Sequence, residues 1–213
     1  RLYQENFDCL IEIFKEKNIN CIFSYDYNQV LSYSEKERNI PKQLASIENF
    51  KEQKLSGRIR TNMEVNSFIK NVINLNKRPH SYVDYRNIEV LYATNYISAK
   101  KIVDYYINNK KYKFITYTPS MYVSNKIDHF NGYTNTHHVI GQEFDNVMIS
   151  MDDNFQYDDK GRLQGKAHPN PDYIFYQLWF QGVSRTREKL CILVIGNEKL
   201  FNRILEIKNR PNA

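Results

Sequence analysis

Hydrophobic and polar residues follow first the period of a helix and then that of a strand. The apolar positions at helical spacing are Phe7, Leu10, Ile11 and Phe14. They predict an amphipathic helix over residues 3–17. The apolar run over residues 19–25 predicts a strand, which a polar turn at residues 26–29 ends. Residues 34–53 are charged and have no clear period, which indicates a surface helix or a connector.

A helix start is predicted at residues 61–64. Thr61 and Glu64 have the spacing of a capping box, in which each side chain satisfies a free backbone donor at the helix start. The apolar face of this helix is expected to consist of Val65, Phe68, Ile69, Val72 and Ile73.

Strands and helices alternate after residue 87. Strands are predicted at 88–93, 113–117, 147–151 and 190–195, and helices at 97–108, 173–182 and 198–207. The helix at 97–108 is expected to turn Ile102, Tyr105 and Tyr106 inward. A turn at residues 158–161 predicts a small hairpin between 155–157 and 162–164. This order predicts an α/β fold with a mostly parallel sheet covered by helices on both faces.

Composition excludes few classes of protein or partner. The 213 residues allow one sizeable core, or one domain with part of another. The net charge of +6 is compatible with a polyanionic partner, although scattered surface lysines give the same total. Cys9, Cys21 and Cys191 have no metal-site spacing, and we expect reduced, buried thiols in a cytoplasmic protein. No apolar run is long enough to span a membrane, so no membrane partner is expected.

Two polar stretches suggest binding residues. Asp26 and Gln29 follow a predicted strand, and ligands bind at the carboxyl ends of parallel strands. The alternative is a turn in which Asp26 and Asn28 bond their own backbone. Arg60 stands beside a helix start, where a planar guanidinium can clamp a phosphate oxygen. It can equally pair with a surface glutamate, Glu64 or Glu52.

A third stretch, residues 136–145, leads into a predicted strand. Gly141 allows a ligand to approach the backbone, and Glu143 offers a carboxylate at a loop mouth. A metal site is conceivable from His137 and His138 with the upstream pair Asp128 and His129. Neighbouring side chains on an extended chain point in opposite directions, however, which argues against one ion between the two histidines.

Two arginines come directly before the last predicted strand. Arg185 and Arg187 stand two residues apart, after an apolar helix-like run. Such a placement would deliver two guanidinium groups to one end of the sheet.

Taken in order, four segments resemble the motifs of superfamily 1 helicases, from residue 1 to about residue 207. The residues in these segments are most similar to those of the Schlafen-like helicases, often found as bacterial ATP-binding proteins. Asp26-x-x-Gln29 looks like motif III. The stretch LSGRIRTN, residues 55–62, is similar to motif IV, with Arg60 on the motif's arginine.

The other two motifs follow in the expected order. His137-x-x-x-Gly141-x-Glu143-Phe144 looks like motif V. The stretch VSRTREKL, residues 183–190, resembles motif VI, with Arg185 on its key arginine.

The resemblance implies a RecA-like fold of the P-loop NTPase type and an ATP-dependent helicase or nucleic-acid translocase. The residues implied in catalysis are Arg185, Arg60 and Gln29. Those implied in nucleotide binding are Asp26, Gly141, Glu143 and Arg187. Arg185 would act as an arginine finger supplied in cis. A structural ion pair is its alternative, and Arg187 is expected to anchor the loop or to pair with Glu188 or Glu143.

The resemblance implies that half of the nucleotide site lies outside this chain. No G-x-x-x-x-G-K-[ST] pattern occurs, so ATP and Mg²⁺ would be bound mainly by a preceding RecA-like domain. We therefore expect the C-terminal part of a larger ATPase. Residues 1–53 would be the remnant of the first RecA-like domain, and residues 54–213 the second.

A track for single-stranded DNA or RNA is expected from the same resemblance. Its residues would be Thr118, Ser120, Tyr122, Thr136 and His137, with charge from Lys126. Hydroxyls can donate to phosphate oxygens, and a tyrosine face can stack on a base. The alternative is that Tyr117 belongs to the core and residues 118–120 are only a turn.

Two other functions stay open. The chain can be a nucleic-acid-binding or regulatory scaffold that kept the fold without motor activity. A metal nuclease would use Glu143, Asp145, Asp152 and Asp153. If the helicase interpretation is right, Gln29, Arg60, Gly141, Glu143 and Arg185 should share one cleft edge, at carboxyl strand ends or at the helix starts beside them.

Overall fold

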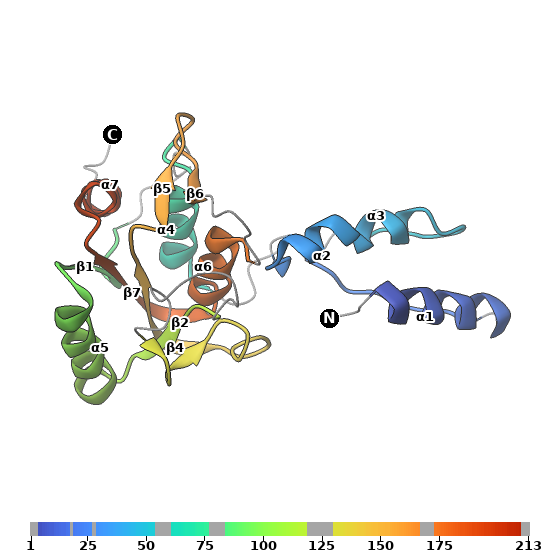
Figure 1. Ribbon diagram of the computed structural model, residues 1–213, viewed down its shortest axis with the longest axis horizontal. Coiled ribbons are helices and arrows are strands. Elements are labelled where there is room, and N and C mark those ends of the chain that lie inside the picture. Colours follow the sequence, from blue (N-terminus) through green and yellow to red (C-terminus); the bar gives the residue numbers. More distant parts are fainter. Residues whose placement is uncertain are drawn as a thin grey trace.

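A parallel sheet forms the centre of the molecule (Figure 1). The computed structural model describes residues 4–17, 19–26, 29–53, 61–76, 84–118, 130–166 and 173–209. The five strands are β1 (Ile88–Ala93), β2 (Lys113–Thr116), β3 (Thr134–Asn135), β4 (Phe144–Met151) and β7 (Thr186–Ile195). Their order in the sheet is β1-β7-β4-β2-β3, and all neighbours are parallel. The predicted α/β fold is confirmed.

The central strand β7 divides the interior into two cores. Its alternate side chains point to opposite faces, as the geometry of a strand requires. Leu190, Ile192 and Val194 pack on one face, and Cys191, Leu193 and Ile195 pack on the other. Because both faces are covered, the strand is apolar at every one of these positions rather than at every second one.

Three helices cover the first face: α4 (Met63–Ile73), α6 (Phe175–Val183) and α7 (Glu198–Lys208). The predicted apolar stripe of α4 is confirmed, since Val65, Phe68, Ile69 and Val72 are buried and Ile73 packs against them. In α6, Trp179 is fully buried. The helical period therefore identifies correctly which side of these elements meets the sheet.

The second face is covered by α5 (Tyr96–Lys110) together with Phe130 and Tyr133. Tyr106 is buried as predicted, but Tyr105 is 53% exposed, so its predicted inward position is wrong. Neighbouring helical residues lie about 100° apart, and Tyr106 takes the inward place, where its hydroxyl bonds Glu89.

Glu89 is a carboxylate held on this face of the sheet. Tyr106 and Tyr112 donate their hydroxyls to its two oxygens, and Lys110 Nζ lies 3.5 Å away. Burial alone would raise the pKa of Glu89, but these hydrogen bonds and the lysine charge outweigh it, and the net pKa is lowered. The carboxylate is therefore charged and already engaged.

The predicted hairpin is confirmed. β5 (Phe155–Tyr157) pairs with β6 (Leu163–Gly165) in antiparallel register. Asp158 fixes the turn, because its Oδ1 accepts from the backbone N–H groups of Lys160 and Arg162 at 2.9 and 2.8 Å. Gly161 has φ +65°, the left-handed conformation that this turn needs.

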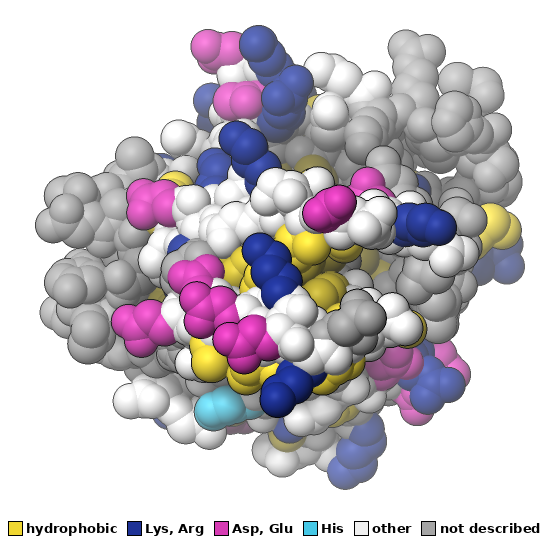
Figure 2. All heavy atoms as spheres, turned by 90° about the vertical axis from the view of Figure 1, so that its right-hand side faces the viewer, with side chains coloured by type: hydrophobic (Ala, Val, Ile, Leu, Met, Phe, Trp, Pro, Cys, Tyr) yellow, Lys and Arg dark blue, Asp and Glu magenta, His cyan; other side chains and the backbone are white. Residues whose placement is uncertain are grey.

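The N-terminal part projects away from the sheet. α1 (Gln4–Lys17), α2 (Tyr33–Arg38) and α3 (Ile40–Ala45) form an arm at the right of Figure 1. Figure 2 views this end, where hydrophobic side chains gather at the centre between acidic and basic ones. The predicted helix over residues 3–17 is confirmed at Gln4–Lys17. In the part of the chain described, no helix is both long and apolar enough to cross a membrane.

The strand predicted at residues 19–25 is wrong. Residues 19–26 carry no strand pairing, and Ile22 is 99% exposed. Phe23 instead packs its ring near those of Phe7 and Phe14, with centroids 6.4 and 6.0 Å apart. An apolar run becomes a strand only where a neighbouring strand can satisfy its backbone, and the described arm offers none.

Two local predictions also fail. The N-cap of α4 is Asn62, not Thr61, because the Asn62 side chain accepts from Val65 N at 2.8 Å. Glu64 reaches away from the cap and accepts from the side-chain amide of Asn87 at 2.8 Å. Of the cysteines, only Cys191 is buried, whereas Cys9 and Cys21 are exposed on the arm.

Gly182 in α6 gives a test of the packing between helix and sheet. A Cβ at this position would lie 2.6 Å from Ile149 Cδ1 of β4. We expect Gly182→Ala to lower the free energy of unfolding by about 1–2 kcal/mol, since overpacking outweighs the better helix propensity of alanine. Urea unfolding measures this.

A second substitution isolates the cause. Ile149→Val removes the Cδ1 atom and alone should cost about 0.5–1.5 kcal/mol. In the double variant the two losses should be less than additive by at least about 0.5 kcal/mol. Strictly additive losses would show that contact with Ile149 is not the cause of the destabilisation by Gly182→Ala.

Candidate functional site

Two of the predicted segments meet at the amino ends of β4 and β7. Phe144 and Thr186 are register partners in neighbouring strands, so the residues before them, Glu143 and Arg185, lie side by side. Phe144 N donates to Arg185 O at 2.9 Å, which closes this end of the sheet. The motif V-like and motif VI-like segments, more than forty residues apart in the chain, are therefore in direct contact.

Arg185 is buried, with 2% of its surface exposed. Its Nε donates to Gln181 O at 3.2 Å, and its Nη1 donates to Gln142 O at 3.4 Å. Gln181 O belongs to the last turn of α6, where free carbonyl groups and the helix dipole favour a cation. The side chain thus connects the end of α6 to the loop before β4.

Arg187 has the opposite environment. It is exposed, and its Nε lies 3.8 Å from Oδ1 of Asp145, also exposed, at the start of β4. The pairing with Glu188 or Glu143 that the sequence suggested is replaced by this one, because Asp145 and Arg187 stand on adjacent strands. An exposed pair at this distance contributes little to stability.

The start of α4 lies at the same place. Asn62 Nδ2 donates to Glu188 O at 3.0 Å, across 126 positions of the chain. Arg60 lies outside the described residues, two positions before Asn62. We refer to Asn62, Gly141, Glu143, Arg185 and Arg187 as the amino-edge cluster.

Gly141 shapes the loop that enters β4. Its φ of +81° is in the left-handed region, which a residue with a side chain adopts at a cost. Gln142 N donates to Val139 O at 3.1 Å, so the chain turns tightly here. This turn sets the Gln142 carbonyl where Arg185 reaches it.

A second group lies where β2 and β3 end. Thr118 Oγ1 is 3.0 Å from Thr136 Oγ1 and is hydrogen bonded to His137 Nδ1. The His137 ring meets the edge of the Tyr173 ring with centroids 5.3 Å apart. We refer to Thr118, Thr136 and His137 as the carboxyl-edge cluster. Thr136 is fully buried, whereas Thr118 and His137 are partly exposed.

Several other predicted residues are not described by the structure. Ser120 and Tyr122, with Lys126, Asp128 and His129, fall outside the described residues. Tyr117 belongs to the core, as the alternative interpretation held, and its hydroxyl bonds Ser150 O. Burial raises the pKa of Tyr117 well above its usual value, so it stays neutral.

Asp26 and Gln29 do not join the amino-edge cluster. Gln29 N donates to Asp26 O at 3.0 Å, and Gln29 Nε2 lies 3.4 Å from Asp26 Oδ2, so the two residues bond each other locally. Asn28, which the alternative interpretation also used, lies outside the described residues. Leu31 O, two residues after Gln29, accepts from Ile174 N at 2.9 Å, before α6 begins. Arg185 follows the end of this nine-residue helix, so α6 separates the two places by roughly 13 Å.

The predicted site residues that come together lie at a different end of the sheet from the one expected. Gly141, Glu143 and Arg185 come together, but at amino ends of strands rather than at carboxyl ends. The reason is the direction of the chain, because each segment leads into its strand. Only the carboxyl-edge cluster occupies the end that open α/β sheets commonly use for ligands.

The four acidic residues of the nuclease interpretation do not form a single metal site. Glu143 and Asp145 stand at the amino end of β4, while Asp152 and Asp153 follow its carboxyl end, more than about 20 Å away. Asp152 is engaged by the Tyr96 hydroxyl at 2.6 Å. Among the described residues, no group of three or more His, Cys, Asp or Glu side chains could hold a metal ion.

Sequence reasoning missed Gln142, Gln181 and Asn62 as supports of the site. Gln181 precedes Arg185 by four residues, the spacing at which helical side chains meet, and this signal was available. Nothing in the sequence points to the Gln142 carbonyl or to Asn62 bonding Glu188, because both depend on how distant segments pack.

Comparisons with known proteins give no identification. No protein-family model matches the chain, and neither the curated proteins nor the solved structures contain a significant match. The helicase resemblance therefore remains an interpretation of the sequence motifs and of their geometry.

The two arginines should differ sharply in their effect on stability. Arg185→Ala leaves buried carbonyl groups without their charged donor and should lower the free energy of unfolding by about 2–3 kcal/mol. Arg187→Ala, the matched control, removes an exposed pair and should cost less than about 1 kcal/mol. Chemical denaturation of the two variants checks this. Equal losses would contradict the structural role of Arg185.

Proposed function

We propose that this chain is the second RecA-like part of an ATP-dependent helicase or nucleic-acid translocase. The amino-edge cluster would face ATP and Mg²⁺ held mainly by a preceding RecA-like domain. The carboxyl-edge cluster would contribute to a track for single-stranded DNA or RNA. The parallel α/β sheet is consistent with a RecA-like fold.

One observation supports this proposal above the others. The segments that resemble motifs IV, V and VI lie far apart in the sequence, yet Asn62 contacts Glu188 and Arg185 contacts Gln142. A chance similarity of short motifs would not require them to meet at one end of one sheet. A shared ligand gives a reason for the meeting.

The chemistry of the amino-edge cluster suits a phosphate partner. Arginine presents a planar fork of donors that matches phosphate oxygens. Arg187 is exposed, and its one ion pair among the described residues is the weak one with Asp145, so it can turn to an anion at little cost. Arg185 would add positive charge near the same oxygens, and so would Arg60, which precedes α4 by three positions in the sequence. Gln29 and Asp26 would act from the other side of the nucleotide.

Arg185 would have to change partners to act as a finger. Its donors now meet the carbonyls of Gln181 and Gln142. A bound triphosphate would offer anionic oxygens, which attract the guanidinium charge more strongly than neutral carbonyl groups do. In this role the two carbonyl groups hold the arginine ready before the nucleotide arrives.

At the carboxyl-edge cluster, hydroxyl and imidazole groups suit a nucleic-acid backbone. Thr118 can donate to a phosphate oxygen once it turns from His137, and protonation of His137 would add a positive charge. The segment 136–143 carries residues of both clusters. It would therefore link the nucleotide side of the domain to the strand side.

A scaffold without motor activity is the second candidate. The observation that favours it is the burial of Arg185, whose donors meet carbonyl groups of its own domain. In that case the arginine serves stability alone. Its removal would then lower the free energy of unfolding, and the full-length protein would show no ATP turnover that depends on Arg185.

ATP hydrolysis by the full-length protein separates the two candidates. We expect turnover stimulated by single-stranded nucleic acid, and a fall in kcat on the order of 10³-fold in Arg185→Lys, which keeps the charge but loses the fork. Lys199→Ala on the exposed side of α7 is the control and should leave kcat unchanged. The isolated chain of 213 residues should not hydrolyse ATP. Turnover by the isolated chain, or full activity of Arg185→Lys, would refute the proposal.

Strand binding is tested separately from turnover. Thr118→Val with His137→Ala should weaken binding of a labelled single-stranded oligonucleotide by about tenfold, while nucleotide affinity stays the same. Fluorescence anisotropy at low and high salt measures this, because phosphate contacts make binding salt-dependent. Unchanged binding would remove the carboxyl-edge cluster from the track. No salt-sensitive binding by the wild type would favour a scaffold that works without nucleic acid.

A further inference from the structure

β1 forms an open edge of the sheet. Asn87 O accepts from Leu190 N and Ala93 O accepts from Gly196 N, so odd-numbered residues turn their backbone groups toward β7. Because strand residues alternate, Ile88, Val90 and Tyr92 turn theirs outward. In the described part of the chain, no strand pairs with this side of β1.

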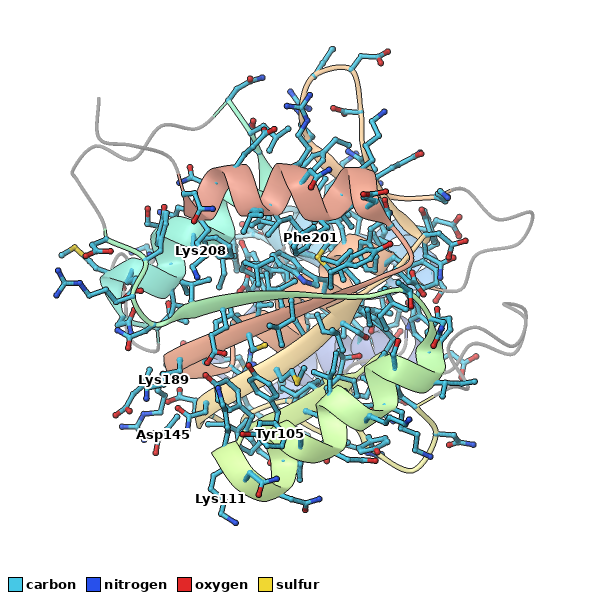
Figure 3. The ribbon with its side chains drawn as sticks, turned by 90° about the vertical axis from the view of Figure 1, so that its left-hand side faces the viewer. Tyr105, Lys111, Asp145, Lys189, Phe201 and Lys208 are labelled. Carbon is cyan, nitrogen blue, oxygen red and sulfur yellow. The ribbon has the colours of Figure 1, made fainter. Side chains whose placement is uncertain are left out.

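A hollow accompanies this edge. Its volume is about 330 Å³, and its lining consists of Leu91, Tyr92, Lys101, Ile102, Tyr105 and Tyr106. Figure 3 looks onto the edge, where β1 crosses the view between α7 above and α5 below. A single extended chain laid against β1 would run between these two helices.

Apolar side chains border both sides of the edge. On α5, Ile97 is 75% exposed and Tyr105 is 53% exposed, and they stand eight residues apart on the face that also carries Lys101. On the other side, the rings of Tyr92 and Phe201 lie 5.2 Å apart. An added strand would place alternate side chains against these two walls.

The charge on the α5 side of the edge is positive, whereas α7 on the other side carries both signs, with Glu198 and Glu206 beside Lys199, Arg203 and Lys208. α5 carries Lys100, Lys101 and Lys110. Its one acidic residue, Asp104, accepts from the Tyr133 hydroxyl at 2.5 Å. Glu89 of β1 is likewise engaged by tyrosines and Lys110. Lys110 is thus already paired, and among the described residues no ion pair engages Lys100 or Lys101. An occupant with acidic side chains therefore meets positive charge at Lys101 in the hollow.

We propose that the β1 edge binds an extended acidic peptide segment of a partner protein, which joins the sheet as a further strand. Outward N–H and C=O groups of Val90 and Tyr92 provide the main-chain hydrogen bonds. The hollow receives apolar side chains, and Lys101 selects acidic ones. This site is separate from both clusters described above, and it does not rest on the proposed ATPase function.

A second copy of the chain is a poorer occupant. Pairing β1 with β1 would bring α5 of each copy, with its lysines, to one seam. Like charges facing each other are unfavourable, and lysine near an edge strand is a common means of preventing such pairing. The net charge of +6 adds to this repulsion.

The test uses a defined probe. A fluorescent synthetic peptide of about ten residues alternates valine or tyrosine with aspartate or glutamate, long enough to cover β1. Its control has the same sequence but is N-methylated at alternate residues on one edge, which removes donors without changing side chains. We expect saturable binding of the first peptide and at least tenfold weaker binding of the second, about 1.4 kcal/mol.

Proline variants test the edge from the side of the protein. Val90→Pro removes an outward N–H and leaves the bonds to β7 intact, so the protein should fold while peptide affinity falls at least about tenfold. Leu91→Pro is the matched control. It removes a hydrogen bond to β7, so the variant should not fold and should show no cooperative unfolding transition. Lys101→Glu should weaken the acidic peptide by a similar factor and needs no change in the backbone.

Several outcomes would overturn the proposal. They are no binding of the unmethylated peptide at millimolar concentration, equal binding of both peptides, or full affinity in Lys101→Glu. Light scattering gives one more. A dimer of the wild type that Val90→Pro converts to a monomer would assign the edge to a second copy instead.

Discussion

The pairing of β7 on both of its sides is the constraint on which the other features depend. β1 and β4 both align with it in parallel register, and its side chains supply both cores. A strand enclosed in this way must enter the sheet at a fixed point. Arg185 and Arg187 stand at that entry, so the register of β7 determines their positions.

Arg185 shows how stability and the proposed role in catalysis can share one side chain. Its guanidinium group connects the last turn of α6 with the loop before β4, and burial keeps both contacts away from water. The same contacts orient the group at the edge where three distant segments meet. Arg187, two residues on, is exposed to solvent and pairs only weakly with the exposed Asp145 in the described structure. The two arginines therefore differ in environment although the sequence presents them as a pair.

The sequence was sufficient where local pattern and final environment agree. Apolar runs identified β1 and the buried half of β7, and the helical period identified the inner face of α4, because the burial of these elements follows from their own residues. Residues 19–25 failed because a strand needs a neighbour that its own sequence cannot supply. The predicted capping box failed because Glu64 is engaged by Asn87, and the contact of Arg185 with Gln142 was missed because it joins segments far apart in the chain.

The two borders of the sheet are unequal. β1 contributes six residues at one border, whereas β3 contributes two at the other in the described structure. Growth of a fibre by strand addition requires a receptive border on each side of every molecule, so that one unit can follow another. With a single long border, association through the sheet stops after one step. The chain can thus keep an adhesive strand without the capacity to polymerise through it.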